Sequence, residues 1–391
     1  MPHDKLTIVE VKTWPLRYKR RVPMFDARLG YESRESLLVE VVTNKGVTGI
    51  GEAAVFGGSL PVVAAAVRKL ADLIIGENPL YVEKIWEKCY QSSWQWGQRG
   101  VFLMALSGID IALWDIVGQL SELPLYQIFG ACRDELPGYA SGGFYEEGKN
   151  IADLQKECAR YVEQGFKAVK IKVGRRPSEF LPLHTHCRSS LEEDVQRVKA
   201  VRQAIGDKVT LMLDANNAWD PKTAVKAIEH FEPFDPYFIE EPVPVENLSG
   251  SAWVKRVSRV PIAGYETLSI HARWGYQELL QKEAVDIVQF DVTWCGGLTE
   301  ARKIAHLAAA HQLVCIPHCF SSAVALAATL HLLCSIPNSA YIEIDVTPNP
   351  LRDEIISEPF IVTNAGTVKA PKNPGLGIKM DWKAIKRYTI E

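Results

Sequence analysis

The chain has 391 residues, of which 47% are apolar, and its formal net charge is only −3. A chain of this length can bury a large core without a metal or disulfide to hold it, and it has room for a barrel of about 250 residues plus a smaller domain. The charge balance excludes a nucleic acid or an anionic membrane as the main partner, because both select a concentrated basic face. A small molecule is the expected partner.

The sequence predicts a cytoplasmic protein. The first residues, MPHDKLTIVEV, lack the charged-then-apolar order of a signal peptide, and we expect no stretch to provide the roughly 20 apolar residues of a membrane span. The eight cysteines are scattered without paired spacing, which indicates reduced thiols rather than a disulfide framework or a zinc site.

Residues 1–130 are predicted to form an α+β domain. Three segments alternate apolar and polar residues, namely LTIVEVKTW, SLLVEVVT and VTGIGEAAV, and Asn44-Lys45-Gly46 makes a hairpin-like turn between the last two. Helical patterns follow over residues 61–75, 79–92 and 101–122. Strands followed by helices favour a small antiparallel sheet with helices packed on it.

The pattern then changes to short β-branched or aromatic runs that alternate with helical stretches. Eight runs are expected to be strands: GYASGGF, FKAVKIKVG, VTLMLDANN, PYFIEEPV, VPIAGYE, VDIVQFDV, LVCIPH and AYIEIDV. Such alternation predicts a parallel (β/α) barrel, assigned to residues 131–360. Residues 361–391 are rich in Pro and Gly and are expected to return to the first domain.

A titratable residue ends each of the last six expected strands. These residues are spaced 25 to 27 positions apart, and they are Asp214, Glu240, Glu266, Asp291, His318 and Glu343. Because the carboxyl ends of barrel strands open on one mouth, the six side chains are expected to converge there. Helix N-caps or turns would explain any one acid, but six in step point to a site.

Asp214, Glu240 and Glu266 are the candidate metal ligands. They offer hard oxygens from three consecutive strands, and no soft ligand interrupts them, which suits Mg²⁺. Three salt-bridged acids are the alternative. That alternative is weaker, because carboxylates that converge on one mouth repel each other unless a cation lies between them.

Proton-transfer groups are expected on two sides of this mouth. Lys170 and Lys172 lie two residues apart and so point into the barrel, where lost solvation and a nearby cation would lower their pKa values and make a base. Asp291 can orient the imidazole of His318, which becomes a second proton-transfer group. Glu343 is expected to donate a hydrogen bond to an oxyanion if its pKa is raised enough to keep it protonated. These groups predict proton abstraction from the carbon beside a carboxylate.

Seven motifs, in order, carry a resemblance over nearly the whole chain: AVKIKVG, LMLDANNAW, FIEEP, GYE, DVTWCGG, PHCF and YIEID. Through them the sequence closely resembles the mandelate racemase subgroup of the enolase superfamily. The resemblance implies an N-terminal α+β capping domain, a modified (β/α)8 TIM barrel of the (β/α)7β type, one Mg²⁺ per subunit and a homo-oligomer. Relatives of the muconate cycloisomerase kind would present a lysine at the end of the sixth strand, where this chain has Asp291.

The same resemblance implies roles for individual residues. The residues carried over by motif are the metal ligands Asp214, Glu240 and Glu266, the base Lys172, the acid or base dyad Asp291 and His318, the stabilisers of carboxylate and enolate Lys170 and Glu343, and the substrate or ligand-shell contact Asn216.

The expected activity is dehydration of a sugar acid, in which the α-proton is removed and the 3-hydroxyl eliminated to give a 2-keto-3-deoxy acid. In the resembled family the capping domain reads the far end of the substrate, here through residues 19–33 and 55–60. The first of these loops is charged, which suits hydroxyl groups better than a phenyl ring. A racemase or epimerase using the same two bases, and a non-catalytic ligand-binding barrel, remain alternatives.

An insertion, RRPSEFLPLHTHCRSS, follows the second barrel strand, since Lys172 and Asp214 are 42 residues apart. Loops in this position overlook the active site. It offers a transition-metal site at His184, His186 and Cys187, or a contact from Arg175 or Arg176 to a distal substrate group, or only a solvated or subunit-contact loop.

Overall fold

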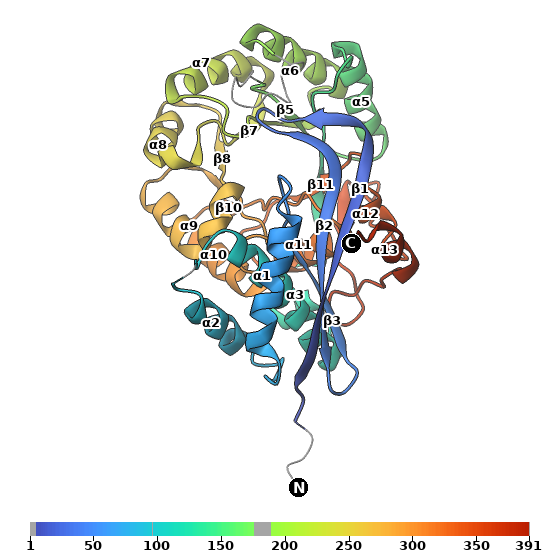
Figure 1. The fold of residues 1–391 in the computed structure, drawn as a ribbon. Coiled ribbons are helices and arrows are strands. Elements are labelled where there is room, and N and C mark those ends of the chain that lie inside the picture. Colours follow the sequence, from blue (N-terminus) through green and yellow to red (C-terminus); the bar gives the residue numbers. More distant parts are fainter. Residues whose placement is uncertain (1–4, 96, 176–188, 391) are drawn as a thin grey trace.

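An antiparallel sheet and four helices open the part of the chain that the computed structural model describes, which comprises residues 5–95, 97–175 and 189–390. The strands lie in the order β1 (Ile8–Phe25), β2 (Gly30–Thr43) and β3 (Thr48–Ala53). The helices are α1 (Leu60–Ile74), α2 (Val82–Ser92), α3 (Val101–Leu120) and α4 (Leu125–Ile128). The predicted α+β arrangement is confirmed. In Figure 1 the three blue strands lie in front of the barrel.

Helix α3 lies directly on β3. A Cβ atom at Gly51 would come within 2.0 Å of the Gly108 carbonyl oxygen, so only glycine permits this approach. The expectation that no segment could span a membrane was wrong for α3, whose length and composition pass that test. The packing gives the reason, because 83% of its most apolar window is buried inside the protein and Asp110 and Asp115 within it are buried too.

The barrel within the described residues has eight strands, each parallel to its neighbours. They are β4 (Glu135–Ser141), β5 (Ala168–Lys172), β6 (Thr210–Asp214), β7 (Pro236–Glu240), β8 (Ile262–Gly264), β9 (Ile287–Val288), β10 (Val314–Cys315) and β11 (Ile342–Asp345). A single bridge between Cys315 and Ser339 joins β10 to the segment before β11. The predicted parallel barrel is confirmed.

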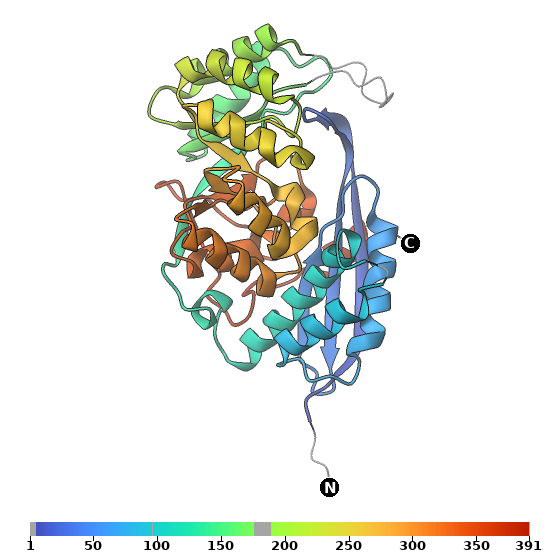
Figure 2. The same cartoon turned by 90° about the vertical axis from the view of Figure 1, so that its left-hand side faces the viewer.

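Helices cover the outside of the barrel between successive strands (Figure 2). They are α5 (Ile151–Glu163), α6 (Leu191–Ile205), α7 (Pro221–Phe231), α8 (Leu248–Val257), α9 (Ala272–Gln281), α10 (Leu298–Ala310) and α11 (Ala323–Ser335). Short 3₁₀ turns lie at η2 (Glu232–Phe234), η3 (Val245–Asn247) and η4 (Glu266–His271). Because each helix follows a strand and β11 closes the series, the arrangement is (β/α)7β.

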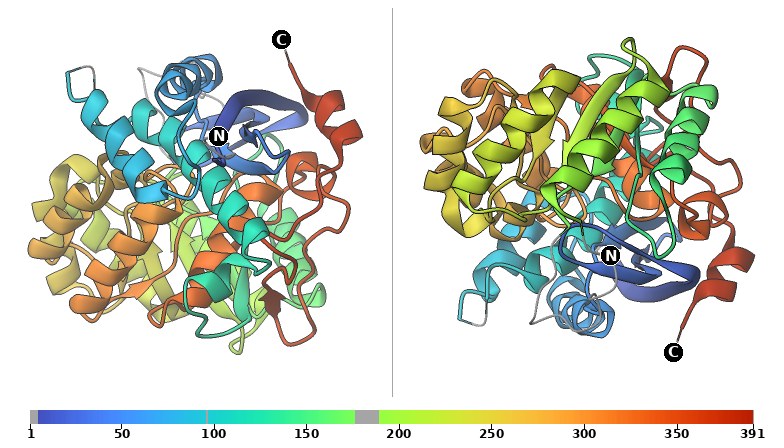
Figure 3. Two further views of the ribbon diagram at one scale, coloured as in Figure 1. Left: turned by 90° about the horizontal axis from the view of Figure 1, so that it is seen from below. Right: turned by 90° about the horizontal axis from the view of Figure 1, so that it is seen from above.

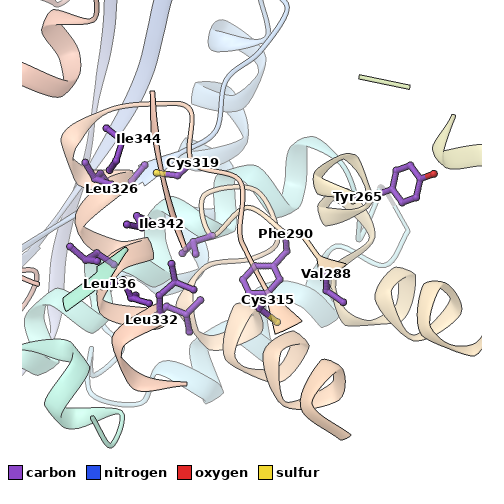
Figure 4. Close-up of a cluster of buried hydrophobic side chains, with 14 of the residues drawn as sticks. Leu136, Tyr265, Val288, Phe290, Cys315, Cys319, Leu326, Leu332, Ile342 and Ile344 are labelled. Carbon is purple, nitrogen blue, oxygen red and sulfur yellow. The ribbon is translucent and has the colours of Figure 1, made fainter. Parts of the chain in front are cut away.

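Strand alternation sorts the barrel side chains into two sets. In β6, Leu211 and Leu213 belong to the large core that the strands share with the helices, part of which Figure 4 shows, whereas Met212 belongs to a separate buried cluster with residues such as Phe238. Since side chains two residues apart share a face, Asp214 follows Met212 on the inner face. Inside the barrel, the charged residues therefore form the next layer after this apolar cluster, toward the carboxyl ends of the strands.

The last part of the chain touches both the barrel and the first sheet (Figure 3). Strand β12 (Thr367–Lys369) pairs antiparallel with β4, and helix α13 (Trp382–Tyr388) lies against β1, where the Trp14 and Trp382 rings are 5.2 Å apart. Helix α12 (Pro350–Asp353) precedes both. The division of the chain at residues 130 and 360 stays a prediction.

Candidate active site

Lys170, inside the barrel, brings three of the predicted acids together. Its Nζ atom lies 2.7 Å from Oε2 of Glu240, 2.9 Å from Oε1 of Glu343 and 3.9 Å from Oδ2 of Asp214. All four side chains are buried. Residues from β5, β6, β7 and β11 thus meet at one point, as the spacing of the acids predicted.

Lys172 forms an ion pair with Asp214, and its Nζ lies 5.0 Å from the centre of the Phe144 ring. The lysine pKa values that we expected to be lowered are raised instead. Burial lowers the pKa of Lys172, but the carboxylates, Asp214 first, outweigh it, and Lys170 behaves in the same way beside Glu240 and Glu343. A base at Lys172 thus requires the charge of Asp214 to be offset.

His318 and Asp291 form the predicted pair. Nδ1 of His318 lies 2.7 Å from Oδ2 of Asp291, although both residues lie just beyond the short strands β10 and β9 rather than within them. Burial alone would lower the pKa of the imidazole, but the hydrogen bond to Asp291 and the charges of Glu343 and Glu266 raise it to about 9. The imidazole is therefore protonated at neutral pH and can act as an acid.

Glu343 does not meet the condition set for it. Burial raises the pKa of a carboxyl, yet Lys170, His318 and Lys172 lower that of Glu343 to about 2. Its Oε2 accepts a hydrogen bond from the amide of Cys319, 2.9 Å away. The three cationic groups around Glu343 therefore keep its carboxyl deprotonated, and its role as a stabiliser of the enolate stays a prediction.

Two of the candidate metal ligands have a carboxylate oxygen without a hydrogen-bond partner. Oε1 of Glu240 and Oε2 of Glu266 are buried and have no hydrogen-bond partner. Burial and nearby carboxylates raise the pKa of Glu240 to about 8 and that of Glu266 well above its usual value. A hard cation would relieve both effects, so the donor set fits Mg²⁺.

In the described residues these carboxylates do not form a metal-binding group. No group of three or more His, Cys, Asp or Glu side chains with metal-binding geometry occurs among residues 5–95, 97–175 and 189–390. Asp214 is instead engaged by Lys172, and Glu266 begins the turn η4 rather than ending a strand. The fit therefore rests on the chemistry of the donors and their unpaired oxygens.

Asn216 lies beside the predicted metal ligand Asp214. Its backbone N–H donates to Oδ1 and its Nδ2 to Oδ2 of that carboxylate, at 2.9 and 3.1 Å, in a left-handed backbone conformation at φ 42°. The buried Oδ1 of Asn216 has no partner. The amide thus binds Asp214 through its nitrogen and has a buried carbonyl oxygen without a hydrogen-bond partner.

The sequence did not single out two polar neighbours of the carboxylates. Nε2 of Gln289 donates to Oε2 of Glu240 at 2.8 Å. The buried Glu241 interacts with the carboxyl of Glu266, and burial raises the pKa of Glu241 to about 7. In the sequence Glu241 is the second acid of FIEEP, where strand alternation turns it away from the inner face.

Two aromatic rings lie beside the imidazole of His318. The Phe56 and Phe320 rings each lie 6.1 Å from its imidazole, and Phe320 also contacts Tyr31 at 5.7 Å. These three aromatic residues line a hollow of about 440 Å³ together with Arg34. Parts of both expected capping loops, residues 30–33 and 55–58, line this hollow, and they present the charged Glu32 as well as the aromatic Tyr31 and Phe56.

A larger hollow of about 660 Å³ lies elsewhere, between residues 18–22 and 146–161. None of the predicted site residues lines it. The predicted site residues do not line the smaller hollow either, but its lining residues Phe56 and Phe320 lie against the His318 ring, so we place the chemistry next to the smaller hollow.

Known families match both parts of the chain. Residues 8–130 match the family described as mandelate racemase / muconate lactonizing enzyme, N-terminal domain, and residues 153–384 match the enolase C-terminal domain-like family. The chain belongs to the mandelate racemase / muconate lactonizing enzyme family.

Relatives within this family are similar over their full length. The chain is 34% identical to an arabinonate dehydratase of Saccharolobus solfataricus, with 97% of this chain and 99% of the relative covered. It is also 34% identical to a D-galactarolactone cycloisomerase of Agrobacterium fabrum, with 98% and 99% covered. A racemase structure from Streptomyces coelicolor A3(2) with bound magnesium superposes with a TM-score of 0.87 at 31% identity, covering 98% of this chain and 100% of that one.

The structure describes only part of the insertion after β5 in this member of the mandelate racemase / muconate lactonizing enzyme family. Arg175 is buried and donates from Nη1 to the carbonyl oxygen of Asp26, 2.8 Å away, while its guanidinium lies 4.8 Å from the Phe25 ring. It therefore ties the capping strand β1 to the barrel. Arg176, His184, His186 and Cys187 lie outside the described residues.

Proposed function

We propose that this chain is a Mg²⁺-dependent dehydratase that acts on a sugar acid. The observation that carries the proposal is a pair of proton-transfer groups, one at the end of β5 and the other just after β10. Lys172 lies beside the carboxylate layer and His318 lies beside Asp291, where the pKa of its imidazole is about 9. An acid that stays protonated at neutral pH suits expulsion of a hydroxyl group. The similarity to an arabinonate dehydratase supports the same choice.

In this proposal Asp214, Glu240 and Glu266 hold the Mg²⁺, one ion per subunit. The unpaired oxygens of Glu240 and Glu266 support the assignment, as does the magnesium in the related racemase structure. When bound, Mg²⁺ supplies positive charge that stabilises a doubly negative enolate.

The remaining residues act on the substrate. Once the charge of Asp214 is offset, Lys172 in its neutral amine form removes the α-proton, and the electron pair of that C–H bond moves into the carboxylate. Lys170 stabilises that carboxylate, and Glu343 holds Lys170 in place, while the unpartnered carbonyl oxygen of Asn216 can accept a hydrogen bond from a substrate hydroxyl group. The electrons then return, the bond from C3 to its oxygen breaks, and His318 gives its proton to the departing hydroxyl, which leaves as water. The enol product tautomerises to the 2-keto-3-deoxy acid.

The same groups permit a second candidate function. Reprotonation of the enolate by His318, with no leaving group expelled, would make the enzyme a racemase or epimerase. The related racemase structure and the cycloisomerase relative favour keeping this candidate. A non-catalytic barrel is the remote alternative. As part of the proposal we place the protein in the cytoplasm as a homo-oligomer with a capping domain over residues 1–130.

Proton NMR in D₂O with Mg²⁺ tests the proposal on a panel of stereoisomeric mono- and diacid sugars. We expect one sugar acid to lose its α-proton signal while a keto-deoxy product appears. Exchange or inversion without product would instead establish the racemase or epimerase. No change with any sugar acid, repeated with hydroxy and amino acids, would refute the proposed substrate class.

A further inference from the structure

Glu52, at the end of capping strand β3, accepts five hydrogen bonds although its side chain is fully buried. Oε2 accepts from the Ser322 hydroxyl at 2.6 Å and the Ala325 amide at 2.8 Å, and Oε1 accepts from the Ser322 amide at 3.2 Å. The hydroxyls of Ser36 and Ser321 also donate to Oε1. Four of the five donors belong to the segment that leads from β10 into α11, so this carboxylate joins the capping sheet to a barrel loop.

That loop carries His318. The loop backbone is held at the Cys319 amide by Glu343 from the barrel and at the Ser322 amide by Glu52 from the capping sheet, and Glu52 also accepts from the Ser321 hydroxyl. The carboxylate lies at the N-terminus of α11, where backbone amides without an intrahelical acceptor favour negative charge. The imidazole thus stands at one end of a segment whose other end is fixed by a residue of the other layer.

We infer that Glu52 is a positioning residue for His318, through which the capping sheet sets the place of the imidazole in the active site. The inference rests on the role proposed for His318. Glu52 touches no reacting group, and its effect passes along the backbone of residues 318–322. Because proton transfer requires the acid within hydrogen-bond reach, a loosened loop lowers turnover even when the fold survives.

Glu52→Gln is the informative substitution because it keeps the shape of the side chain. Whichever way the amide is turned, its NH₂ group faces either the Ser322 amide or the Ala325 amide. A serine hydroxyl can rotate to accept, but a backbone N–H cannot, so one amide must lose its acceptor. Ser321→Ala is the milder companion, since it removes one donor and leaves the carboxylate in place.

The control is Asp115→Asn. Asp115 is also a buried carboxylate of the first part of the chain, and it accepts from the amides of Ile50 and Leu376. The substitution disturbs buried hydrogen bonds of the same kind without touching the His318 loop. Both Glu52→Gln and Asp115→Asn should therefore lower the stability of the fold, but only Glu52→Gln should displace His318.

The experiment combines turnover with two readouts that need no substrate. We expect Glu52→Gln to lower kcat by about 10- to 100-fold, to speed amide hydrogen exchange over residues 318–325, and to move the imidazole C–H NMR signal assigned to His318 with a His318→Asn variant. Ser321→Ala should change all three in the same direction, and Asp115→Asn none of them.

An unchanged His318 signal and unchanged exchange in Glu52→Gln would overturn the inference, as would equal changes in Asp115→Asn. Should Glu52→Gln fail to fold, Ser321→Ala decides by the same readouts. Absence of turnover in the unmodified protein would refute the proposed function instead, while the NMR and exchange readouts would still decide whether Glu52 positions the loop.

Discussion

Oδ2 of Asp291 lies 2.7 Å from Nδ1 of His318, while its Oδ1 accepts from the amide and the hydroxyl of Thr293 at 2.7 and 2.6 Å. The carboxylate is thus fixed by its own loop before it meets the imidazole. This fixes the ring orientation and leaves Nε2 to face the substrate.

Removing this carboxylate should change the pH dependence of turnover. A general acid works only while it holds its proton, so kcat should fall as pH rises through about 9, the pKa of His318. Asp291→Asn removes the main group that raises this pKa, so the fall should move toward the ordinary histidine value of about 6.5. A pH profile of kcat tests the shift. If the fall in kcat at high pH stays at the same pH in Asp291→Asn, a group other than His318 controls that fall.

Loss of Lys172 should abolish the first step and leave metal binding. Lys172→Ala removes the proposed base but none of the proposed metal ligands, so exchange of the α-proton should fall by at least about 10²-fold. NMR in D₂O measures the exchange, and calorimetry measures Mg²⁺ binding. The matched control is Lys199→Ala on the exposed face of α6, which should behave as the unmodified protein. Equal exchange in the two variants would exclude Lys172 as the base.

The carboxylate layer should make stability depend on the metal. Mg²⁺ at about 100 times its Kd should stabilise the protein by about 2.7 kcal/mol, and chelation should abolish turnover until Mg²⁺ is returned. Glu240→Gln should lose most of this stabilisation, whereas Glu229→Gln, exposed on α7, should keep it. Thermal unfolding with and without Mg²⁺ gives the answer. A Glu240→Gln protein that Mg²⁺ stabilises fully would remove Glu240 from the ligand set.

Arg34 links the capping sheet to the end of β11. Its Nη2 lies 2.5 Å from Oδ2 of Asp345, and both side chains are buried. Because Arg34→Met would leave the buried Asp345 without its salt-bridge partner, with Thr347 and Asn349 still donating to it, the substitution should lower the free energy of unfolding by about 3–5 kcal/mol in urea. Arg259→Met removes the partner of an exposed pair with Glu232 and should change it by no more than about 0.5 kcal/mol. Similar losses in both would show that the Arg34 pair is not buried in solution.

The placement of the site could be predicted from the sequence, but its protonation could not. Regular spacing and strand alternation depend only on neighbours along the chain, so they placed residues such as Asp214 and Glu240 on one inner face. The pKa values of Lys172 and Glu343 depend on distances between strands far apart in sequence, and both moved against expectation. Glu52 escaped notice for the same reason, because its partners lie about 270 residues away.

Helix α3 has a consequence for the newly made chain. It leaves the ribosome before any barrel strand exists to cover it, as an apolar segment long enough to enter a bilayer. Asp110 lies at its middle, where an aspartate costs about 2.5–3.5 kcal/mol on insertion into lipid, and Asp115 follows toward its C-terminal end. Once the barrel has formed, Asp110 accepts from the amide of Thr299 and Asp115 from that of Leu376. The two acids that bind these later segments thus also make entry of the unfinished helix into a bilayer less favourable.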